Sequence, residues 1–243
     1  MMIKDNNIMQ LALDFPHRPS LGREDFMVAS CNQEAVNTID LWPAWSYFAI
    51  CIYGPEGCGK THLANVFAQI VALQTNHPYR IPFIKASNIN KNLAHTLFET
   101  SPQIVIEDLQ NLSNQEALFH LYNTYRDLGG NILFTANKAP ARINFSLPDL
   151  RSRMNIVPAL EIKTPDDDLL MTLLVKLFTD RQINPSPELI TYLINNMQRS
   201  FSYARKLVEE IDNISLARKR SVSLTIAKEA LTTLNADLQF NLF

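Results

Sequence analysis

The residues with the most evident chemistry form one segment, Gly54-Pro55-Glu56-Gly57-Cys58-Gly59-Lys60-Thr61. It satisfies the spacing G-x-x-x-x-G-K-[ST] in full. Glycines let the backbone fold so that its N–H groups converge on phosphate oxygens, and the lysine brings a mobile positive charge. The threonine hydroxyl is a suitable Mg²⁺ ligand. The segment predicts a loop for nucleotide phosphates in which all eight residues take part. The alternative is a glycine turn with a coincidental Lys-Thr.

Two carboxylates follow an apolar run at Ile104-Val105-Ile106-Glu107-Asp108. A carboxylate at the carboxyl end of a parallel strand points into the ligand crevice of an open α/β sheet. There it can make a second contact to Mg²⁺ and orient a water molecule. Beside a phosphate loop we therefore expect Glu107 and Thr61 to bind the metal. Without that loop, a surface strand ending in acid is the simpler reading.

A polar pair, Thr135 and Asn137, lies at the end of a third apolar run. An uncharged amide at this place can hold an attacking water or a terminal phosphate. The spacing alone favours an asparagine that caps the turn before Pro140. Both readings of Asn137 stay open at this point.

Alternating strands and helices are expected to position these groups. Strands are predicted at 47–53, 81–86, 103–107, 131–136 and 156–162, the last weakened by Pro158. Helices are predicted at 32–41, 60–74, 90–98 and 114–128, with Asn32 as the N-cap of the first. Alternation of this kind is typical of an α/β fold with a parallel sheet and helices on both faces.

The pattern changes after Lys163. Amphipathic helices are predicted at 166–181, 187–198, 202–218 and 225–234, and no strand candidate remains. We therefore predict three parts. They are an extended arm at 1–22, an α/β nucleotide-binding domain at 23–163, and a small helical domain at 164–243.

Composition narrows the class of protein. The chain has 243 residues, of which 47% are apolar and 19% charged, with a net charge of −2. These values exclude intrinsic disorder and give no support for a strongly basic nucleic-acid-binding surface. Three cysteines without paired spacing predict neither a disulfide framework nor a zinc site. No run of about 18 apolar residues and no signal peptide is present, so a cytoplasmic protein with no membrane contact is expected.

Taken together, these segments resemble the AAA+ ATPases, and their DnaA branch in particular. Gly59 to Leu63 reads Gly-Lys-Thr-His-Leu, which is similar to the DnaA form of the loop. Arg23 to Ala35, including Val28, resembles the segment on the adenine side of the nucleotide. Trp42 to Trp45 is similar to the DnaA-related short proteins of the Hda type.

The resemblance implies a role for each matching residue. It implies ATP or ADP with Mg²⁺ as cofactors, His62 and Val28 as nucleotide contacts, and the four helices as a lid. Glu107 and Asp108 would be the Walker B pair and Asn137 the sensor I residue. Arg153, in Leu150-Arg151-Ser152-Arg153, would be the arginine finger, and Arg205 the sensor II arginine.

Two departures from the family pattern stand out. Glu107 stands where the family has Asp, which puts Mg²⁺ geometry and hydrolysis by this chain in question. The sequence ends at Phe243, directly after the predicted lid, so we expect no helix-turn-helix domain and no origin-binding initiator.

Motifs near the two ends suggest partners. Gln10-Leu11-Ala12-Leu13-Asp14-Phe15 resembles peptides that dock into the bacterial sliding clamp, with Leu13 and Phe15 as apolar anchors and Gln10 at the rim. An arm that folds back on its own core is the alternative. Gln239 to Phe243 is a weaker candidate of the same kind. The cluster Arg218-Lys219-Arg220 fits a solvated helix end better than a DNA contact.

The resemblance implies a regulator of chromosomal replication initiation. Tethered to the clamp, and to DNA only through it, the protein would promote hydrolysis of ATP bound to DnaA and so repress re-initiation. It would be an activator of DnaA more than a strong ATPase itself, and its oligomeric state stays open. The alternatives are a helicase-loading or transposase-helper ATPase acting on DNA, and a degenerate AAA+ protein that binds nucleotide as a structural ligand.

Overall fold

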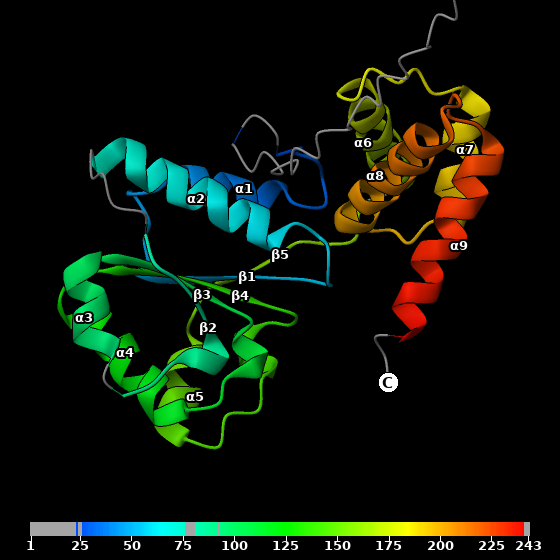
Figure 1. Ribbon diagram of the computed structural model, residues 1–243. Coiled ribbons are helices and arrows are strands. Elements are labelled where there is room, and N and C mark those ends of the chain that lie inside the picture. The colour runs from blue at the N-terminus through cyan, green and yellow to red at the C-terminus, as the bar shows by residue number, and fades with distance from the viewer. Residues whose placement is uncertain (1–22, 24–25, 76–80, 92, 241–243) are drawn as a thin grey trace, which may run out of the picture.

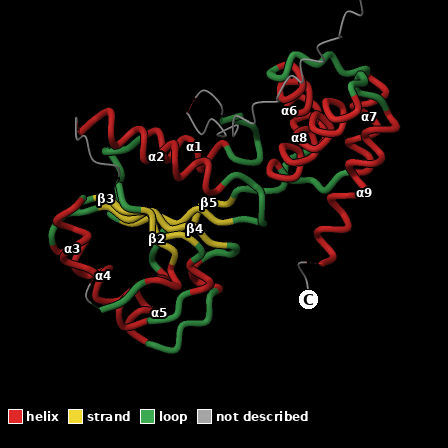
Figure 2. Tube along the Cα trace, viewed as in Figure 1, coloured by secondary structure: helices red, strands yellow, loops and turns green. Residues whose placement is uncertain are grey.

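A parallel sheet of five strands forms the centre of the α/β part of the molecule (Figures 1 and 2). The computed structural model describes residue 23 and residues 26–75, 81–91 and 93–240. The strands are β1 (Ala49–Tyr53), β2 (Phe83–Lys85), β3 (Gln103–Glu107), β4 (Asn131–Ala136) and β5 (Ala159–Glu161). Their order is β2-β3-β4-β1-β5, and every neighbouring pair is parallel. All carboxyl ends therefore lie along one edge.

The central strands are apolar throughout because both of their faces are covered. Ile50 and Ile52 of β1 belong to one core and Cys51 to the other. In β4, Leu133 and Phe134 divide between the two cores in the same way. Alternate side chains of a strand point to opposite faces, so a strand buried on both sides reads as a continuous apolar run.

Helices cover the two faces of this sheet (Figure 1). On one face lie α1 (Gln33–Asp40) and α2 (Lys60–Thr75). On the other lie α3 (Leu93–Thr100), α4 (Gln115–Asp127) and α5 (Pro148–Asn155). Short 3₁₀ turns, η2 (Ala86–Asn88), η3 (Leu109–Asn111) and η4 (Pro140–Arg142), follow the ends of β2, β3 and β4. The predicted α/β class with helices on both faces is confirmed.

The last four helices pack around a core of their own. They are α6 (Asp167–Thr179), α7 (Pro187–Asn196), α8 (Phe201–Arg218) and α9 (Leu224–Phe240). Asp166, Ser186 and Ser200 cap α6, α7 and α8, each accepting a hydrogen bond from a backbone N–H three residues on. Arg218 ends α8, and Lys219 takes the left-handed conformation that stops a helix. The basic cluster thus lies at a helix end, and the exact domain boundaries stay a prediction.

Several expected bounds differ from the structure. The helix α5 was missed, and its C-cap, Ile156, lies inside the predicted strand 156–162. As a result β5 begins only after Pro158, whose carbonyl accepts a hydrogen bond from the Cys51 N–H at 2.8 Å. At the other end, α9 runs past its expected limit of 234 to Phe240.

Asn32 occupies the predicted N-cap position of α1, where its carbonyl accepts a hydrogen bond from the Val36 N–H at 3.0 Å, but its side chain makes no capping hydrogen bond. Its amide instead accepts a hydrogen bond from the Ala29 N–H and donates one to the Met27 carbonyl, both at 2.9 Å. The Asn32 side chain therefore organises the loop before the helix.

Candidate functional site

The phosphate loop links β1 to α2 at the carboxyl edge of the sheet. Gly57 and Gly59 have φ angles of +73° and +105°, a region that side chains other than glycine rarely adopt. Gly54 is required for a different reason, because a Cβ there would lie 2.1 Å from the Ile162 carbonyl oxygen. The glycines of the motif thus permit both the turn and its close approach to the segment after β5.

Lys60 is the first residue of α2. Its ammonium group donates hydrogen bonds to the carbonyls of Gly54 at 2.9 Å and Pro55 at 2.7 Å. These bonds bring the charge back over the loop, where a phosphate would be held at the positive end of the helix.

The next residue contacts the acidic end of β3. The Thr61 hydroxyl donates a hydrogen bond to Oε1 of Glu107 at 3.1 Å. A hydroxyl and a carboxylate at this distance are hard oxygen donors of the kind Mg²⁺ prefers, so the pair fits that metal. Among the described residues no cluster of three or more His, Cys, Asp or Glu side chains is arranged for a metal ion. Phosphate oxygens and water would therefore have to complete its coordination.

Asp108 follows β3 with a left-handed backbone, φ 57° and ψ 50°. Its N–H donates to Oγ1 of the buried Thr135 on β4 at 3.3 Å. Its carboxylate accepts a hydrogen bond from the Gln110 side chain at 3.3 Å, and the Gln110 oxygen accepts one from the Asn137 N–H at 3.0 Å. The two strand tips that carry the predicted Walker B and sensor I residues are thus joined.

A cavity of about 460 Å³ lies between the phosphate loop and the last four helices. Residues of the phosphate loop, the start of α2, the segment before α1 and the end of β3 line one side, and residues of α6 and α8 line the other. The lining residues are Phe26, Met27, Glu56, Gly57, Gly59, Lys60, Thr61, His62, Asp108, Leu173, Phe201, Ser202, Arg205 and Lys206. A space of this size, with an apolar end and converging charges, is typical of small-molecule sites.

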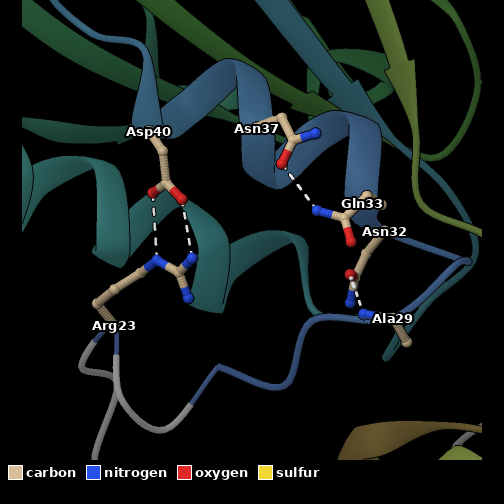
Figure 3. Close-up of polar contacts among 6 residues, drawn as sticks. All are labelled: Arg23, Ala29, Asn32, Gln33, Asn37 and Asp40. Carbon is tan, nitrogen blue, oxygen red and sulfur yellow. Dashed lines mark hydrogen bonds and ion pairs between the residues drawn. The ribbon is translucent and has the colours of Figure 1, made fainter.

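The segment before α1 supplies part of the apolar lining of this cavity. Asn32 fixes the turn through Ala29, and Arg23 pairs through two nitrogens with both carboxylate oxygens of Asp40 (Figure 3). A hydrogen bond from Gln33 to Asn37 runs along the outside of α1 in the same view. These contacts hold the ends of the segment that carries Phe26 and Met27.

His62 and Arg205 meet across the cavity. Nη2 of Arg205 lies 3.4 Å from Nδ1 of His62, which connects α8 to the first turn of α2. The Phe26 ring packs edge-on against the His62 ring with 5.0 Å between centroids. Both predicted residues therefore lie in the cavity wall.

The start of α8 also contacts the phosphate loop directly. The Gly57 carbonyl accepts hydrogen bonds from the N–H groups of Phe201 at 3.1 Å and Ser202 at 3.4 Å. A Cβ on Gly57 would lie 2.1 Å from the Ser200 hydroxyl oxygen. The missing side chain of Gly57 therefore allows α8 to approach the loop.

Other predicted residues lie outside the cavity lining. Cys58 is buried beneath the loop, and burial raises the pKa of its thiol. Val28 is 40% exposed, while its neighbours Phe26 and Met27 line the cavity. Asn137 is exposed beyond β4.

Arg153 is on α5, across the sheet from α2 (Figure 1). It is not among the described residues that line the cavity. Burial raises the pKa of the Tyr122 hydroxyl on α4, and the positive charge of the Arg153 guanidinium opposes that rise. The predicted finger is therefore remote from the cavity of its own chain.

The predicted clamp contacts Gln10, Leu11, Leu13 and Phe15 lie outside the described residues. Sequence reasoning missed Leu173, Phe201, Ser202 and Lys206, which have no motif of their own and reach the site through the packing of α6 and α8. It also missed Gln110, whose position two residues after Asp108 was the available signal.

The fold and the loop together define an AAA+ P-loop protein with a helical lid. Residues 19–160 match the family described as the bacterial DnaA ATPase domain, and the chain belongs to that family. In the part of the chain that the structure describes, no helix is both long and apolar enough to cross a membrane.

Relatives and solved structures agree with this assignment. The DnaA initiator of Caldanaerobacter subterraneus is 23% identical over 88% of this chain and 52% of its own length. Domain III of Thermotoga maritima DnaA has a TM-score of 0.76 at 20% identity, covering 90% of this chain and 98% of that one. AMPPCP-bound DnaA from Aquifex aeolicus has a TM-score of 0.68 at 21% identity, covering 80% and 66%. The chain spans about half the length of the DnaA proteins that it matches.

Proposed function

We propose that this protein binds an adenine nucleotide between its phosphate loop and its last four helices, and that it regulates replication initiation. The cavity wall supports the proposal, because it combines Lys60 and Thr61 of the loop with Asp108 of the sheet and Arg205 of α8. A DnaA structure of the same fold contains AMPPCP, an adenine nucleotide analogue. The family of initiators provides the link to replication.

The chain's own residues would divide the work on the nucleotide. Lys60 binds the terminal phosphates, and the loop N–H groups bind the phosphate nearer the base. Thr61 and Glu107 would hold Mg²⁺, which neutralises charge on the phosphates when bound. Asp108 orients water, Asn137 contacts the terminal phosphate, and Arg205 adds positive charge from the lid.

We further propose that Arg153 acts on the nucleotide of a neighbouring DnaA molecule. Its place across the sheet from α2, away from the cavity of its own chain, is consistent with an arginine supplied in trans. Such a residue stabilises the charge that develops during phosphoryl transfer, and arginine fingers accelerate hydrolysis by about 10³–10⁵-fold. This role corresponds to the DnaA-related regulators of the Hda type.

A tether to the sliding clamp through Gln10, Leu11, Leu13 and Phe15 completes the proposal. This part rests on the sequence motif alone. Holding the protein near DNA-bound DnaA raises the effective concentration of Arg153 without any new contact at the reacting phosphates.

The test is hydrolysis of DnaA-bound ATP in the presence of clamp loaded on DNA. The full chain should accelerate hydrolysis, Arg153→Ala should lose at least about tenfold of that acceleration, and Arg151→Ala should keep it. Arg151 is an exposed arginine two residues away on the same helix, so it controls for charge. Equal activity of Arg153→Ala and the unmodified chain would contradict the trans role.

A separate experiment addresses the tether. In a pull-down, the clamp should no longer capture the Gln10→Ala variant and should still capture a chain that lacks residues 239–243. A helicase-loading ATPase would instead be favoured if this chain alone hydrolysed ATP strongly, if single-stranded DNA stimulated that hydrolysis, and if added salt removed the stimulation.

A further inference from the structure

Gln110 occupies the middle of η3, the single turn that follows Asp108. Its side chain is half-buried and makes two hydrogen bonds of opposite sense. Nε2 donates to Oδ1 of Asp108 at 3.3 Å, and Oε1 accepts from the Asn137 N–H at 3.0 Å. One amide therefore bridges the tips of β3 and β4.

The left-handed backbone of Asp108 is held by contacts other than Gln110. A residue with a Cβ adopts this conformation only where its surroundings hold it there. The turn supplies one bond, from the Asn111 N–H to the Asp108 carbonyl at 2.7 Å. Thr135 accepts a hydrogen bond from the Asp108 N–H, and the Gln110 amide donates one to the Asp108 carboxylate. Without Gln110 the backbone stays fixed while the carboxylate can turn.

The chemistry of the amide suits both partners at once. A carboxylate needs a donor, and a backbone N–H needs an acceptor, so the bridging group must offer one of each. Glutamate keeps the acceptor but places a second negative charge beside Asp108. Alanine removes both contacts. Glutamate therefore removes the donor half of the bridge alone, and alanine removes the whole bridge.

We propose that Gln110 is a positioning residue that sets the Asp108 carboxylate and the Asn137 peptide as one unit, and thereby makes the site distinguish a nucleoside triphosphate from a diphosphate. This inference rests on the proposed nucleotide function. Asp108 lines the cavity next to the residues assigned to the terminal phosphate, and Asn137 follows the neighbouring strand. A nucleoside diphosphate lacks the γ-phosphate that the pair would meet, so its binding does not depend on the bridge.

The experiment compares ATP and ADP affinities, both with Mg²⁺, by titration calorimetry on the full chain. Gln110→Ala and Gln110→Glu should each weaken ATP binding about tenfold and change ADP binding less than about twofold, the effect of one lost hydrogen bond to a charged group. The matched control is Gln115→Ala. Gln115 also makes two side-chain hydrogen bonds, accepting from Ser146 and the Leu147 N–H, and it does not line the cavity. It should leave both affinities unchanged.

Each outcome decides the matter. Wild-type selectivity in either Gln110 variant would overturn the bridge, as would an equal loss for ATP and ADP. If Gln115→Ala lost as much selectivity for ATP over ADP as Gln110→Ala, the effect would be a general loss of stability, and the specific role of Gln110 would be overturned. If the unmodified chain bound neither nucleotide, the proposed function would fall first. If it bound both and the variants matched it, only the role of Gln110 would fall.

Discussion

At the scale of single residues, the site depends on two positions, Gly54 and Gly57, where any side chain would clash with a neighbouring segment. Gly54 leaves room for the Ile162 carbonyl, and Gly57 leaves room for Ser200 and Ser202 at the start of α8. The second of these couples the phosphate loop to the lid. A methyl group is therefore enough to disturb two elements that are far apart in the sequence.

Gly57→Ala should destabilise the protein more than Gly129→Ala. Both residues have nearly the same φ, +73° and +75°, but nothing lies within 4 Å of a Cβ on Gly129. Gly129→Ala should lower the free energy of unfolding by about 1 kcal/mol, the cost of the left-handed backbone. Gly57→Ala should lower it by about 2 kcal/mol or more, because Ser200 must also leave its capping position.

Urea unfolding measures both values, and Ser200→Gly gives a further check. Added to Gly57→Ala, it should restore part of the lost stability because it removes the clashing hydroxyl. Equal losses in the two glycine variants would show that α8 does not press on the loop in solution.

The three cysteines make stability fall at alkaline pH. Burial raises the pKa of the thiols of Cys31, Cys51 and Cys58 above the ordinary value. Below about pH 8.5 the thiols are neutral in both states and the stabilisation is complete. At higher pH the unfolded chain loses protons that the folded chain keeps, so the free energy of unfolding decreases by up to about 1.4 kcal/mol per pH unit for each thiol.

Urea unfolding at about pH 8 and about pH 10 measures this slope. Cys51→Ala should flatten it, although a smaller buried side chain lowers stability at both pH values. The same slope in Cys51→Ala and the unmodified chain would rule out a contribution from that thiol.

At the scale of elements, the segment before α1 determines one wall of the cavity. Asn32 is 1% exposed and satisfies two backbone groups of that segment. Asn32→Ala leaves both groups without a partner and should lower the free energy of unfolding by about 2–4 kcal/mol. Nucleotide affinity should fall as well, because Phe26 and Met27 lose their fixed position.

Gln33→Ala is the matched control for Asn32→Ala. Gln33 is an exposed neighbour with one hydrogen bond along α1, and its loss should stay within about 0.5 kcal/mol. Chemical unfolding measures the change in the free energy of unfolding, and nucleotide titration measures the change in affinity. An Asn32→Ala variant that matched Gln33→Ala in both would contradict the role of the segment.

The sequence predicted the elements that are buried on both sides and the motif that they carry. Continuous apolar runs identified β1, β3 and β4, and their carboxyl ends located the loop and the acids. The short helix α5 was missed because only Leu150 and Met154 of its residues are buried, too few for a helical period.

Contacts between elements were beyond this reasoning. An asparagine before a helix usually caps it with its side chain, so the sequence could not show that the Asn32 side chain would instead bond the preceding loop. The bridge through Gln110 joins strands whose separation in sequence carries no information about their distance. The lid contacts of Phe201 and Ser202 depend on how α8 approaches Gly57.

At the scale of the whole molecule, a ligand in the cavity would contact Phe26 of one sheet core and Leu173 of the core of the last four helices, so it should stabilise these two parts together. ADP with Mg²⁺ at about 100 times its dissociation constant adds about 2.7 kcal/mol to the folded state. For a chain of this size that corresponds to roughly 5–10 °C in the melting temperature. Lys60→Ala should abolish the shift, because the loop loses its main positive charge.

Differential scanning calorimetry with and without nucleotide measures the shift. Lys85→Ala, an exposed lysine at the end of β2, should keep it. A Lys60→Ala variant that melts lower without nucleotide, yet still promotes hydrolysis on DnaA, would favour a purely structural ligand.

The contact of α8 with Gly57 limits how the last four helices can turn. They are joined to the sheet by the backbone between Ile162 and Asp166, and the start of α8 touches the loop at a second point. Arg205 of the same helix contacts His62 at a third point, which ties α8 to the first turn of α2 as well. Any separation of the two sides of the cavity must therefore break the contacts at both Gly57 and His62.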